Sequence, residues 1–507
     1  MAGWLFDNNP RNVIPRWRNF TQTLSLGELA PIISFNKGQS LVNSSQHQKK
    51  INDWKIEKTV KNAIELLNSS YILDDLNNSI ESASFLQQSV TREKPLNILS
   101  NRILTPSISN SFSEQINDFE HLNSLIRSMI QKIRMCLSNN QNNPISWVEL
   151  ARLYLIIGKE KAAERCILVA IQLSPDNRYI SRSASRFFAH VGDFKMAKKI
   201  LKTNIAFSFD PWLIGADIGI SSLQNKNSFH IKKGKELANS NNYSPFELNE
   251  LFSALATVEL NVGSTKNSKK LFNDSLNNPN DNSLAQAVWA KKHIQDLNFS
   301  QVPFERVPNI FEAKAYQYFN NKQWNQTMTN ALQWFVDQPF SREPASFGSF
   351  LACSILENYD EAIKLCVYGL KSTPGDFTLM NNLSFSYLQK NMVKEAQYVI
   401  NKISLENLLD QEKIVFLATK GLLKYKLNLI AEGEELYKSA IQLAIKTKNH
   451  KYKLLAEFHH VSIRLEAEGF PADKMPLVDK LSDELDNLDE IYLGDLVKNL
   501  KKRMKEA

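Results

Sequence analysis

Residues 144–175 have the sequence PISWVELARLYLIIGKEKAAERCILVAIQLSP, and this stretch decides the fold class. Its small residues stand at positions 8, 20 and 27 of the stretch: Ala151, Ala163 and Ala170. Small side chains at this spacing let two antiparallel helices approach closely, and larger side chains fill the space between them. Gly158 and Pro175 stand where the two helices should end. The stretch therefore predicts a helix–turn–helix unit.

The same spacing returns 34 residues later and again further along the chain. A unit counted from Arg178 has matching residues at positions 7, 11, 15, 20 and 24: Ala184, Phe188, Gly192, Ala197 and Leu201. Weaker matches fill about residues 212–275, and later units begin at Pro308, Glu343, Phe377 and Ile414. One unit cannot bury its apolar face alone, so neighbouring units must stack. The period predicts an all-α solenoid.

This pattern resembles the tetratricopeptide repeat (TPR) over about residues 144–445. The resemblance implies a right-handed α-solenoid that binds other proteins and has no catalytic activity. We expect residues 1–50 to form a partly extended N-terminal arm and residues 51–143 a helical module that caps the array. Within that module we expect helices over 51–68 and about 113–137, and polar connectors over 36–50 and 91–111. Residues 446–507 should add C-terminal helices, the last of them a basic capping helix.

Composition excludes several classes of protein and names no partner. The chain of 507 residues has a net charge of +8, which is spread over 61 basic and 53 acidic side chains. Its four cysteines form no C-x-x-C pair, which argues against a disulfide framework or a zinc site and favours a reducing compartment. There is no signal peptide or long apolar span, so we expect a cytoplasmic protein. The abundant Asn, Lys and Ile are typical of an AT-rich genome and favour a bacterial source.

The motifs of common enzymes are absent from the sequence. It contains no phosphate-binding loop, dinucleotide-binding turn, H-E-x-x-H helix or G-x-S-x-G elbow. Cys353 and Cys366 fall at positions 11 and 24 of one unit, which face each other across the helix pair, so they should be core residues. His459 and His460 are adjacent and should point to different sides of a helix. We therefore expect no catalytic residues, no cofactor and no metal.

The resemblance implies a concave groove lined by positions 2, 5, 9, 12 and 13 of each first helix. We expect these partner-groove residues: Arg152, Arg182, Arg186, Tyr316, Phe347, Leu351, Asn381 and Phe385. Such a groove would be basic at one end and aromatic at the other, and would suit an acidic segment followed by an apolar helix or extended stretch. Alternatively, these side chains cover the inner helices, or residues 1–50 bind there as an intramolecular ligand.

One TPR variant can be excluded from the residues in the first unit. TPR proteins that bind the C-terminal carboxylate of chaperones have Lys and Asn at positions 5 and 9 of that unit, where this chain has Val148 and Arg152. An adaptor for chaperone tails is therefore not expected.

The N-terminal arm is rich in aromatic residues and arginine, and it allows two interpretations. One is an extended segment that packs back onto the solenoid. The other is a docking arm that inserts an exposed aromatic anchor into a partner, with three candidate anchors: Trp4, Phe6 and Trp17.

Pairs of lysines recur at positions 21 and 22 of three successive second helices. They form a predicted basic stripe: Lys198, Lys199, Lys232, Lys233, Lys269 and Lys270. Such a stripe could bind nucleic-acid phosphates without sequence preference. However, no aromatic residues for base stacking accompany it, and lysine-rich outer faces are commonly only solvated.

We therefore predict a non-catalytic scaffold or adaptor that binds a partner protein, as a peptide or helix, in the solenoid groove. A first alternative is a sensor or regulatory subunit of a separately encoded effector, for example in a bacterial stress or phage-defence system. A second alternative is a nucleic-acid-binding subunit that uses the lysine stripe. The sequence predicts no membrane association and leaves the oligomeric state open.

Overall fold

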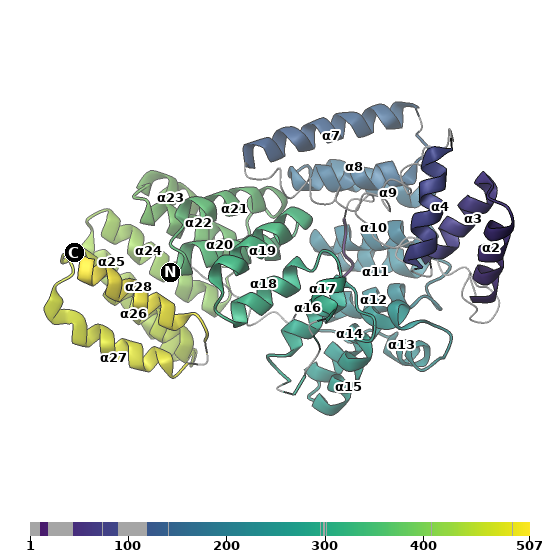
Figure 1. Ribbon diagram of the computed structural model, residues 1–507. Coiled ribbons are helices and arrows are strands. Elements are labelled where there is room, and N and C mark those ends of the chain that lie inside the picture. Colours follow the sequence, from purple (N-terminus) through teal and green to yellow (C-terminus); the bar gives the residue numbers. More distant parts are fainter. Residues whose placement is uncertain are drawn as a thin grey trace. The chain divides into compact units, whose positions relative to one another are not determined.

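A computed structural model describes residues 11–18, 44–72, 75–89, 119–139 and 141–506, apart from residues 295, 298, 299, 301, 407 and 489. The chain divides into two compact units, shown in Figure 1. Unit 2 comprises Arg11–Leu155 and Glu160–Ile310, and unit 1 consists chiefly of Phe311–Ala507. All regular secondary structure within the described ranges is helical, which confirms the predicted all-α class.

The first helices of unit 2 form a small three-helix module: α2 (Ser44–Ile56), α3 (Val60–Ile72) and α4 (Leu76–Gln88). Its core contains Trp54, Leu66 and Leu86. The predicted single helix over 51–68 is wrong, because the chain leaves α2 after Ile56 and the Thr59 side-chain oxygen accepts a hydrogen bond from the Asn62 amide. The predicted connector over 36–50 is wrong in its last part, since residues 44–50 belong to α2. Residues 91–111 lie outside the described part of the chain.

Unit 2 continues with helical hairpins that follow the predicted repeat. Their bounds are α7 (Phe119–Asn139), α8 (Pro144–Ile156), α9 (Glu160–Leu173), α10 (Arg178–His190), α11 (Phe194–Thr203), α12 (Pro211–Leu223), α13 (Ile231–Ala238), α14 (Pro245–Asn261), α15 (Thr265–Ser275), α16 (Asp281–Ala290) and α17 (Val302–Arg306). Side-chain caps at Asn177, Asp210 and Ser244 begin α10, α12 and α14. The first helices α10, α12, α14 and α16 pack in this order and form one layer.

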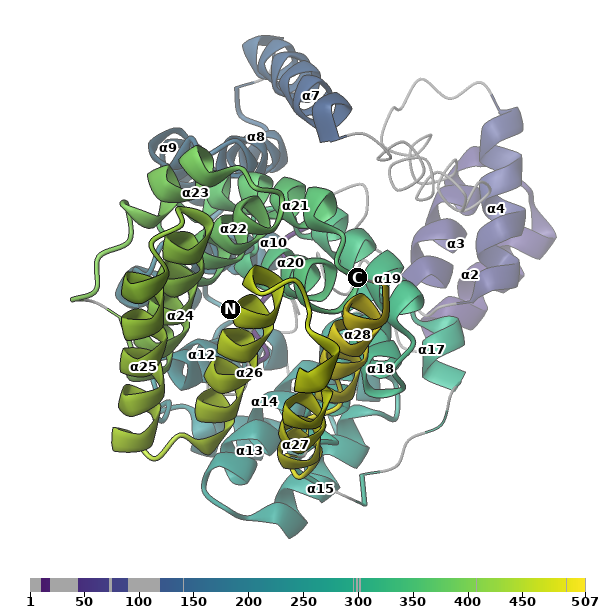
Figure 2. The same cartoon turned by 90° about the vertical axis from the view of Figure 1, so that its left-hand side faces the viewer.

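Unit 1 contains four more of the predicted hairpins and then three C-terminal helices. Their bounds are α18 (Phe311–Asn320), α19 (Trp324–Asp337), α20 (Arg342–Phe350), the π-helical η4 (Leu351–Ile355), α21 (Tyr359–Ser372), α22 (Phe377–Gln389), α23 (Val393–Ile400), α24 (Asp410–Lys426), α25 (Ile430–Lys446), α26 (His450–Ala467), α27 (Met475–Asp486) and α28 (Leu493–Glu506). Figure 2 shows the hairpin of α24 and α25 beside α26. The hairpins counted from Pro308, Glu343, Phe377 and Ile414 are all present as helix pairs.

The small residues of the repeat hold the helices of a pair close together, as their spacing predicts. A Cβ atom added at Gly421 would lie 2.7 Å from a ring carbon of Tyr437, and one added at Gly433 would lie 2.6 Å from a ring carbon of Tyr425. Both distances are shorter than real Cβ contacts, so positions 8 and 20 of this unit accept only glycine without rearrangement.

The C-terminal helix α28 has the exposed basic side that the sequence predicted, with Lys498, Lys502 and Lys505. Its apolar side is buried: Leu493, Leu496, Val497, Leu500 and Met504. Tyr492 packs against Phe350 of α20 with ring centroids 5.2 Å apart, and Asn499 donates a hydrogen bond to the carbonyl oxygen of Ile355. The helix therefore folds back against α20 and η4 within unit 1. No helix in the described ranges is both long and apolar enough to span a bilayer.

Candidate peptide-binding groove

An extended segment lies on the first helices of unit 2, and we call residues 11–18 the N-terminal segment. Six of its eight side chains are buried, and Trp17 and Val13 have exposed fractions of only 0% and 1%. The segment contacts α10, α12 and α16, and this contacted face is called the groove. Within the segment the Ile14 amide donates a hydrogen bond to the Asn12 carbonyl oxygen at 2.9 Å. Side chains of the helices bind other main-chain groups of the segment.

Two amide side chains of α16, Asn282 and Gln286, bind the first half of the segment. They are four residues apart and therefore share one face of the helix. The Gln286 amide accepts a hydrogen bond from the Arg11 guanidinium at 2.6 Å and donates one to the Arg11 carbonyl oxygen at 2.7 Å. Asn282 likewise accepts from Arg11 at 2.9 Å and donates to the Ile14 carbonyl oxygen at 2.9 Å. Each amide thus binds both a side chain and the main chain.

Residues of α14 fix the orientation of this amide pair. The Thr257 hydroxyl donates to the carbonyl oxygen of Ser253, so its oxygen accepts a hydrogen bond from Gln286 at 2.9 Å. The Glu250 carboxylate accepts from Asn282 at 3.1 Å and also from Arg182 at 2.8 Å. Because both amide nitrogens already have an acceptor on α14, their oxygens are oriented toward the Arg11 guanidinium.

Asp281 binds the arginines in the second half of the segment. Its two carboxylate oxygens accept hydrogen bonds from Arg18 at 3.1 and 2.6 Å, which is the bidentate geometry of a guanidinium–carboxylate pair. Arg16 donates to the same carboxylate at 3.1 Å. Asp281 is the first residue of α16, where the helix dipole also favours a negative charge.

Tyr179 and Phe187 of α10 hold the end of the segment. The Tyr179 hydroxyl lies 3.0 Å from the Arg18 carbonyl oxygen and 2.9 Å from the Glu149 carboxylate. Burial, together with the nearby Glu149 charge, raises the pKa of Tyr179 well above its ordinary value, so the phenol stays protonated and can donate. The Trp17 ring meets Phe187 edge-on with centroids 6.4 Å apart.

Gly219 of α12 allows the segment to approach the helix. A Cβ atom added there would lie 2.1 Å from the carbonyl oxygen of Val13. No side chain larger than hydrogen fits at this position while the segment is in place.

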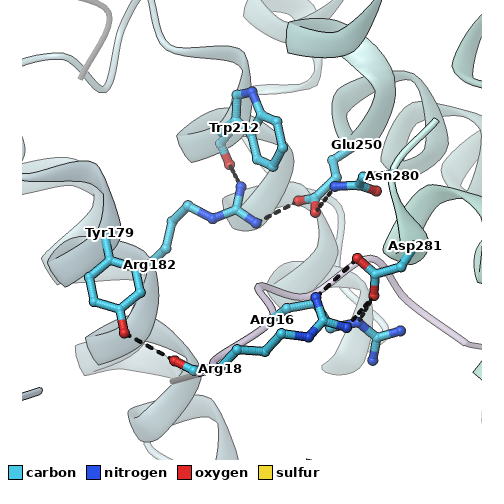
Figure 3. Close-up of a pocket in the computed structure, with 8 residues that line it drawn as sticks. All are labelled: Arg16, Arg18, Tyr179, Arg182, Trp212, Glu250, Asn280 and Asp281. Atoms are coloured by element: carbon cyan, nitrogen blue, oxygen red, sulfur yellow. Dashed lines mark hydrogen bonds and ion pairs between the residues drawn. The ribbon is translucent and has the colours of Figure 1, made fainter. Parts of the chain in front are cut away.

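A small cavity remains between the segment and the helices, and Figure 3 shows its lining. Its volume is about 30 Å³. It is lined by Arg16, Arg18, Tyr179, Arg182, Trp212, Glu250, Asn280 and Asp281. Arg182 lies over the Trp212 ring at 4.6 Å from the centroid and donates to Glu250, as drawn in Figure 3. The N-terminal segment and the helices of unit 2 thus line this cavity together.

The predicted groove residues of unit 2 are buried, and two of their charges have carboxylate partners. Arg152, Arg182 and Arg186 have exposed fractions of 5–6%. Arg152 pairs with Glu149 at 3.4 Å and Arg182 with Glu250. The expected acidic ligand is not what occupies this face, because the N-terminal segment brings three further arginines. The sequence reasoning missed Glu250 and Thr257, although they stand at groove positions 2 and 9 of the unit with Gly263 at position 15.

The predicted groove residues of unit 1 are also buried: Tyr316, Phe347, Leu351, Asn381 and Phe385. The Phe347 ring lies 5.6 Å from Tyr316 and 5.5 Å from Phe319, and Phe319 in turn lies 6.5 Å from Tyr492 beside α28. The C-terminal part of unit 1 thus packs on this aromatic cluster. Binding of a partner there stays a prediction.

Of the three candidate anchors of the docking arm, only Trp17 lies within the described residues. Trp4 and Phe6 lie outside the described residues. Trp17 is fully buried against α10, so it is not the exposed anchor that the docking arm requires. For residues 11–18 the structure shows the packing interpretation instead.

The lysine stripe lies on α11, α13 and α15, with one lysine of each pair more exposed than the other. Lys199, Lys232 and Lys270 are exposed. Their neighbours have partners: Lys198 donates to Gln224, Lys233 pairs with Glu236 and Lys269 pairs with Asp296. Three of the six predicted charges are therefore already engaged.

A serine, histidine and aspartate lie together in the three-helix module, and the sequence analysis did not anticipate them. His47 lies 3.0 Å from the Ser69 hydroxyl and 3.1 Å from the Asp75 carboxylate. Ser69 has an exposed fraction of 1%, and its hydroxyl is also within 3.0 Å of the Leu66 carbonyl oxygen. A hydrolytic serine needs access to substrate, so we interpret this arrangement as a contact that joins α2, α3 and α4.

The cysteines and histidines that could suggest chemistry lie in packed surroundings. Cys353 and Cys366 are buried as predicted, and burial raises the pKa of the Cys353 thiol to about 12. His460 stacks on Tyr437 at 4.8 Å, and His459 meets Phe385 edge-on at 6.0 Å. Within the described ranges, no group of three or more His, Cys, Asp or Glu side chains is placed to hold a metal ion.

Comparison with known proteins gives a limited result. No protein-family model and no curated protein sequence matches the chain. Among solved structures, yeast Tom70 matches at 15% identity with a TM-score of 0.30, covering 79% of this chain and 96% of that one. The Cut9–Hcn1 hetero-tetramer of APC/C matches at 10% identity with a TM-score of 0.38, covering 90% of this chain and 92% of that one. The TPR domain of P58(IPK) matches at 13% identity with a TM-score of 0.24, covering 75% of this chain and 99% of that one. At these scores the fold assignment rests on the hairpins themselves.

Proposed function

We propose that this chain, an all-α protein of TPR-type helical hairpins, is a non-catalytic protein that binds an extended segment of a partner protein in the groove of unit 2. One observation carries the proposal: three side chains from two helices contact main-chain oxygens of the N-terminal segment. Gln286, Asn282 and Tyr179 contact the carbonyl oxygens of Arg11, Ile14 and Arg18. Contacts with the main chain can be made to any extended polypeptide of the right direction, so this face is suited to peptide binding.

In this chain the groove is occupied by the chain itself, which determines how a partner can enter. A tethered segment competes at an effective concentration on the order of millimolar. A partner's segment must therefore bind more tightly than the N-terminal segment, or meet a chain in which that segment has been released. Self-occupancy of this kind favours the regulatory alternative over a permanently open scaffold, because release of the segment would switch binding on.

Nucleic-acid binding is the weaker alternative. Lys199, Lys232 and Lys270 of the lysine stripe are exposed, and each lies next to a lysine that already has a polar partner on the protein. Three exposed charges on separate helices provide a small electrostatic footprint for phosphates.

A peptide titration tests the proposal. The probe is a fluorescein-labelled peptide with the sequence of residues 11–18, added to the wild-type chain and to the full-length Arg11→Ala/Arg18→Ala variant. The two substitutions remove the contacts that Arg11 makes with Asn282 and Gln286 and that Arg18 makes with Asp281, and they leave the groove residues intact. We expect fluorescence anisotropy to show at least about 10-fold tighter binding to the variant, since its groove is open more often.

The matched control is Arg127→Ala/Arg134→Ala, which removes two exposed arginines of α7. This control should bind the peptide as the wild type does. If the Arg11→Ala/Arg18→Ala protein is folded and still binds the peptide no better than the control, the groove is not a peptide-binding site.

A further inference from the structure

We propose that the partner segment carries the motif Arg-x-x-x-Pro-Arg-Trp-Arg, in which the two outer arginines and the tryptophan determine recognition. This inference rests on the proposed function and adds the chemistry of the partner to it. The main-chain contacts tolerate many sequences, so specificity must come from the side-chain sites of the groove. The sites of Arg11, Trp17 and Arg18 carry the proposal.

The Arg11 site consists of the two amide oxygens of Asn282 and Gln286. They accept from two different guanidinium nitrogens, Nη2 and Nη1, at 2.9 and 2.6 Å. A guanidinium presents its donors in a fixed fork, whereas the lysine ammonium is a single point of charge. The site therefore selects arginine over lysine, and a residue without donors would leave two buried amide oxygens without this partner.

The Arg18 site is the carboxylate of Asp281, whose side chain has a relative exposure of 8%. Arg18 fills it in bidentate geometry, and Arg16 adds one contact to the same carboxylate. A partner without arginine at the last position would lose the bidentate contact with this carboxylate. Loss of one partner from a buried charge pair is costly, so this position should contribute strongly to selectivity.

The Trp17 site and the proline complete the motif. Trp17 is fully buried beside Phe187, and buried aromatic anchors commonly dominate binding energy. Pro15 has no amide hydrogen to satisfy, and it restricts the preceding Ile14 to extended conformations. Between Arg11 and Pro15, the main chain at Val13 passes over Gly219 and leaves no space for a bulkier residue on the helix. Of the three x positions, Ile14 is bound through its carbonyl oxygen, whereas the side chains of Asn12 and Val13 are buried.

The occupant is a different protein rather than a second copy of this chain. Each copy brings its own N-terminal segment together with a groove that this segment already fills. Exchange of segments between two copies would replace every contact by an identical one, so it gains nothing to offset the cost of association. A partner that carries the motif and makes additional contacts can displace the tethered segment.

Competition by substituted peptides tests the motif. The receptor is the full-length Arg11→Ala/Arg18→Ala protein with the labelled parent peptide bound, and the competitors are unlabelled peptides with Arg11→Ala, Trp17→Ala, Arg18→Ala or Ile14→Ala. We expect the first three to compete at least about 10-fold more weakly than the parent. The Ile14→Ala peptide is the control and should compete within about 3-fold, because the groove binds Ile14 through its carbonyl oxygen. If the double variant does not fold, the single Arg18→Ala protein replaces it as receptor.

The outcomes separate the motif from the proposed function. If the parent peptide binds and all four competitors lie within about 3-fold of it, the motif is overturned while the peptide-binding groove stands. If the parent peptide does not bind a folded receptor, the proposed function fails as well. The wild-type chain could instead form a concentration-dependent dimer that Gly219→Ala abolishes. This result would show that the occupant is a second copy, and it would overturn the proposal of a different partner protein.

Discussion

Gly219→Ala should expel the N-terminal segment from the groove without removing any groove side chain. The new Cβ atom would lie 2.1 Å from the Val13 carbonyl oxygen, and real Cβ contacts are essentially never closer than 3.0 Å. The segment would have to move by at least 0.9 Å (3.0 minus 2.1 Å) at this point. The hydrogen bonds to the flanking Arg11 and Ile14 carbonyl oxygens are 2.7 and 2.9 Å long, so such a shift would weaken them.

The size of the effect follows from these contacts. Overpacking costs about 1–3 kcal/mol, and it applies only while the segment is bound. Alanine in place of glycine inside α12 stabilises the helix by about 0.5–1 kcal/mol whether or not the segment is bound. The fraction of chains with a released segment should therefore rise about 5- to 150-fold, while the helices of unit 2 remain folded.

Limited trypsin digestion measures this release directly, because Arg11, Arg16 and Arg18 are cleavage sites that are protected when the segment is bound. Cleavage that requires transient opening follows the open population, so the rate at these three bonds should rise by the same factor. Ser222→Ala, also on α12, is the control and should leave the rate unchanged. Unchanged cleavage in a folded Gly219→Ala protein would refute the assignment of the segment to the groove.

Three further predictions concern the rest of the chain. Iodoacetamide should modify only Cys136 of the four cysteines in the native protein, because Cys136 is exposed and the other three are buried. Burial raises the pKa of Cys166 to about 11 and that of Cys353 to about 12. A second rapidly formed adduct in the mass spectrum would contradict this prediction. Loss of solvation lowers the pKa of the half-buried His459, so below pH about 6.5 the unfolded chain binds a proton that the folded chain does not, and stability should fall as pH falls. The free energy of unfolding in urea should drop less between pH 7.5 and 5.5 for His459→Phe than for the wild type, and an equal drop would count against a neutral His459 in the folded chain. Gly433→Ala should destabilise unit 1 by about 1–3 kcal/mol in the same assay, since its Cβ would lie 2.6 Å from the Tyr425 ring. The control Ala431→Gly, at an exposed position of α25, should cost only about 1 kcal/mol.

The repeat could be predicted from the sequence because small residues at fixed spacing decide how closely two helices approach. Gly421 and Gly433 illustrate this, since the structure leaves no room for a Cβ atom at either position. The break in the predicted helix over 51–68 was missed because its apolar periodicity continues across Thr59, where a local side-chain cap begins a new helix.

The groove residues could be predicted only in part. The repeat position of Arg182 identified it as a groove residue. The same positions in the unit of Gly263 would also have identified Glu250 and Thr257, and Glu250 is the carboxylate that neutralises Arg182. Asp281 and Gln286 lie where the repeat loses its register, so no position rule reaches them. Arg11 and Arg18 are about 270 residues away from their partners in sequence, and no local pattern encodes such contacts.

Hydrogen–deuterium exchange in the presence of a competing peptide tests most directly whether unit 2 has a peptide-binding groove. The wild-type chain is incubated with an excess of the residue 11–18 peptide, which carries heavy isotopes so that its fragments are distinguishable from those of the chain. We predict faster exchange at the chain's own residues 11–18 and unchanged protection in α10, α12, α14 and α16, because the added peptide takes the place of the segment. Unchanged exchange of the segment at saturating peptide, or loss of protection throughout unit 2, would contradict the account.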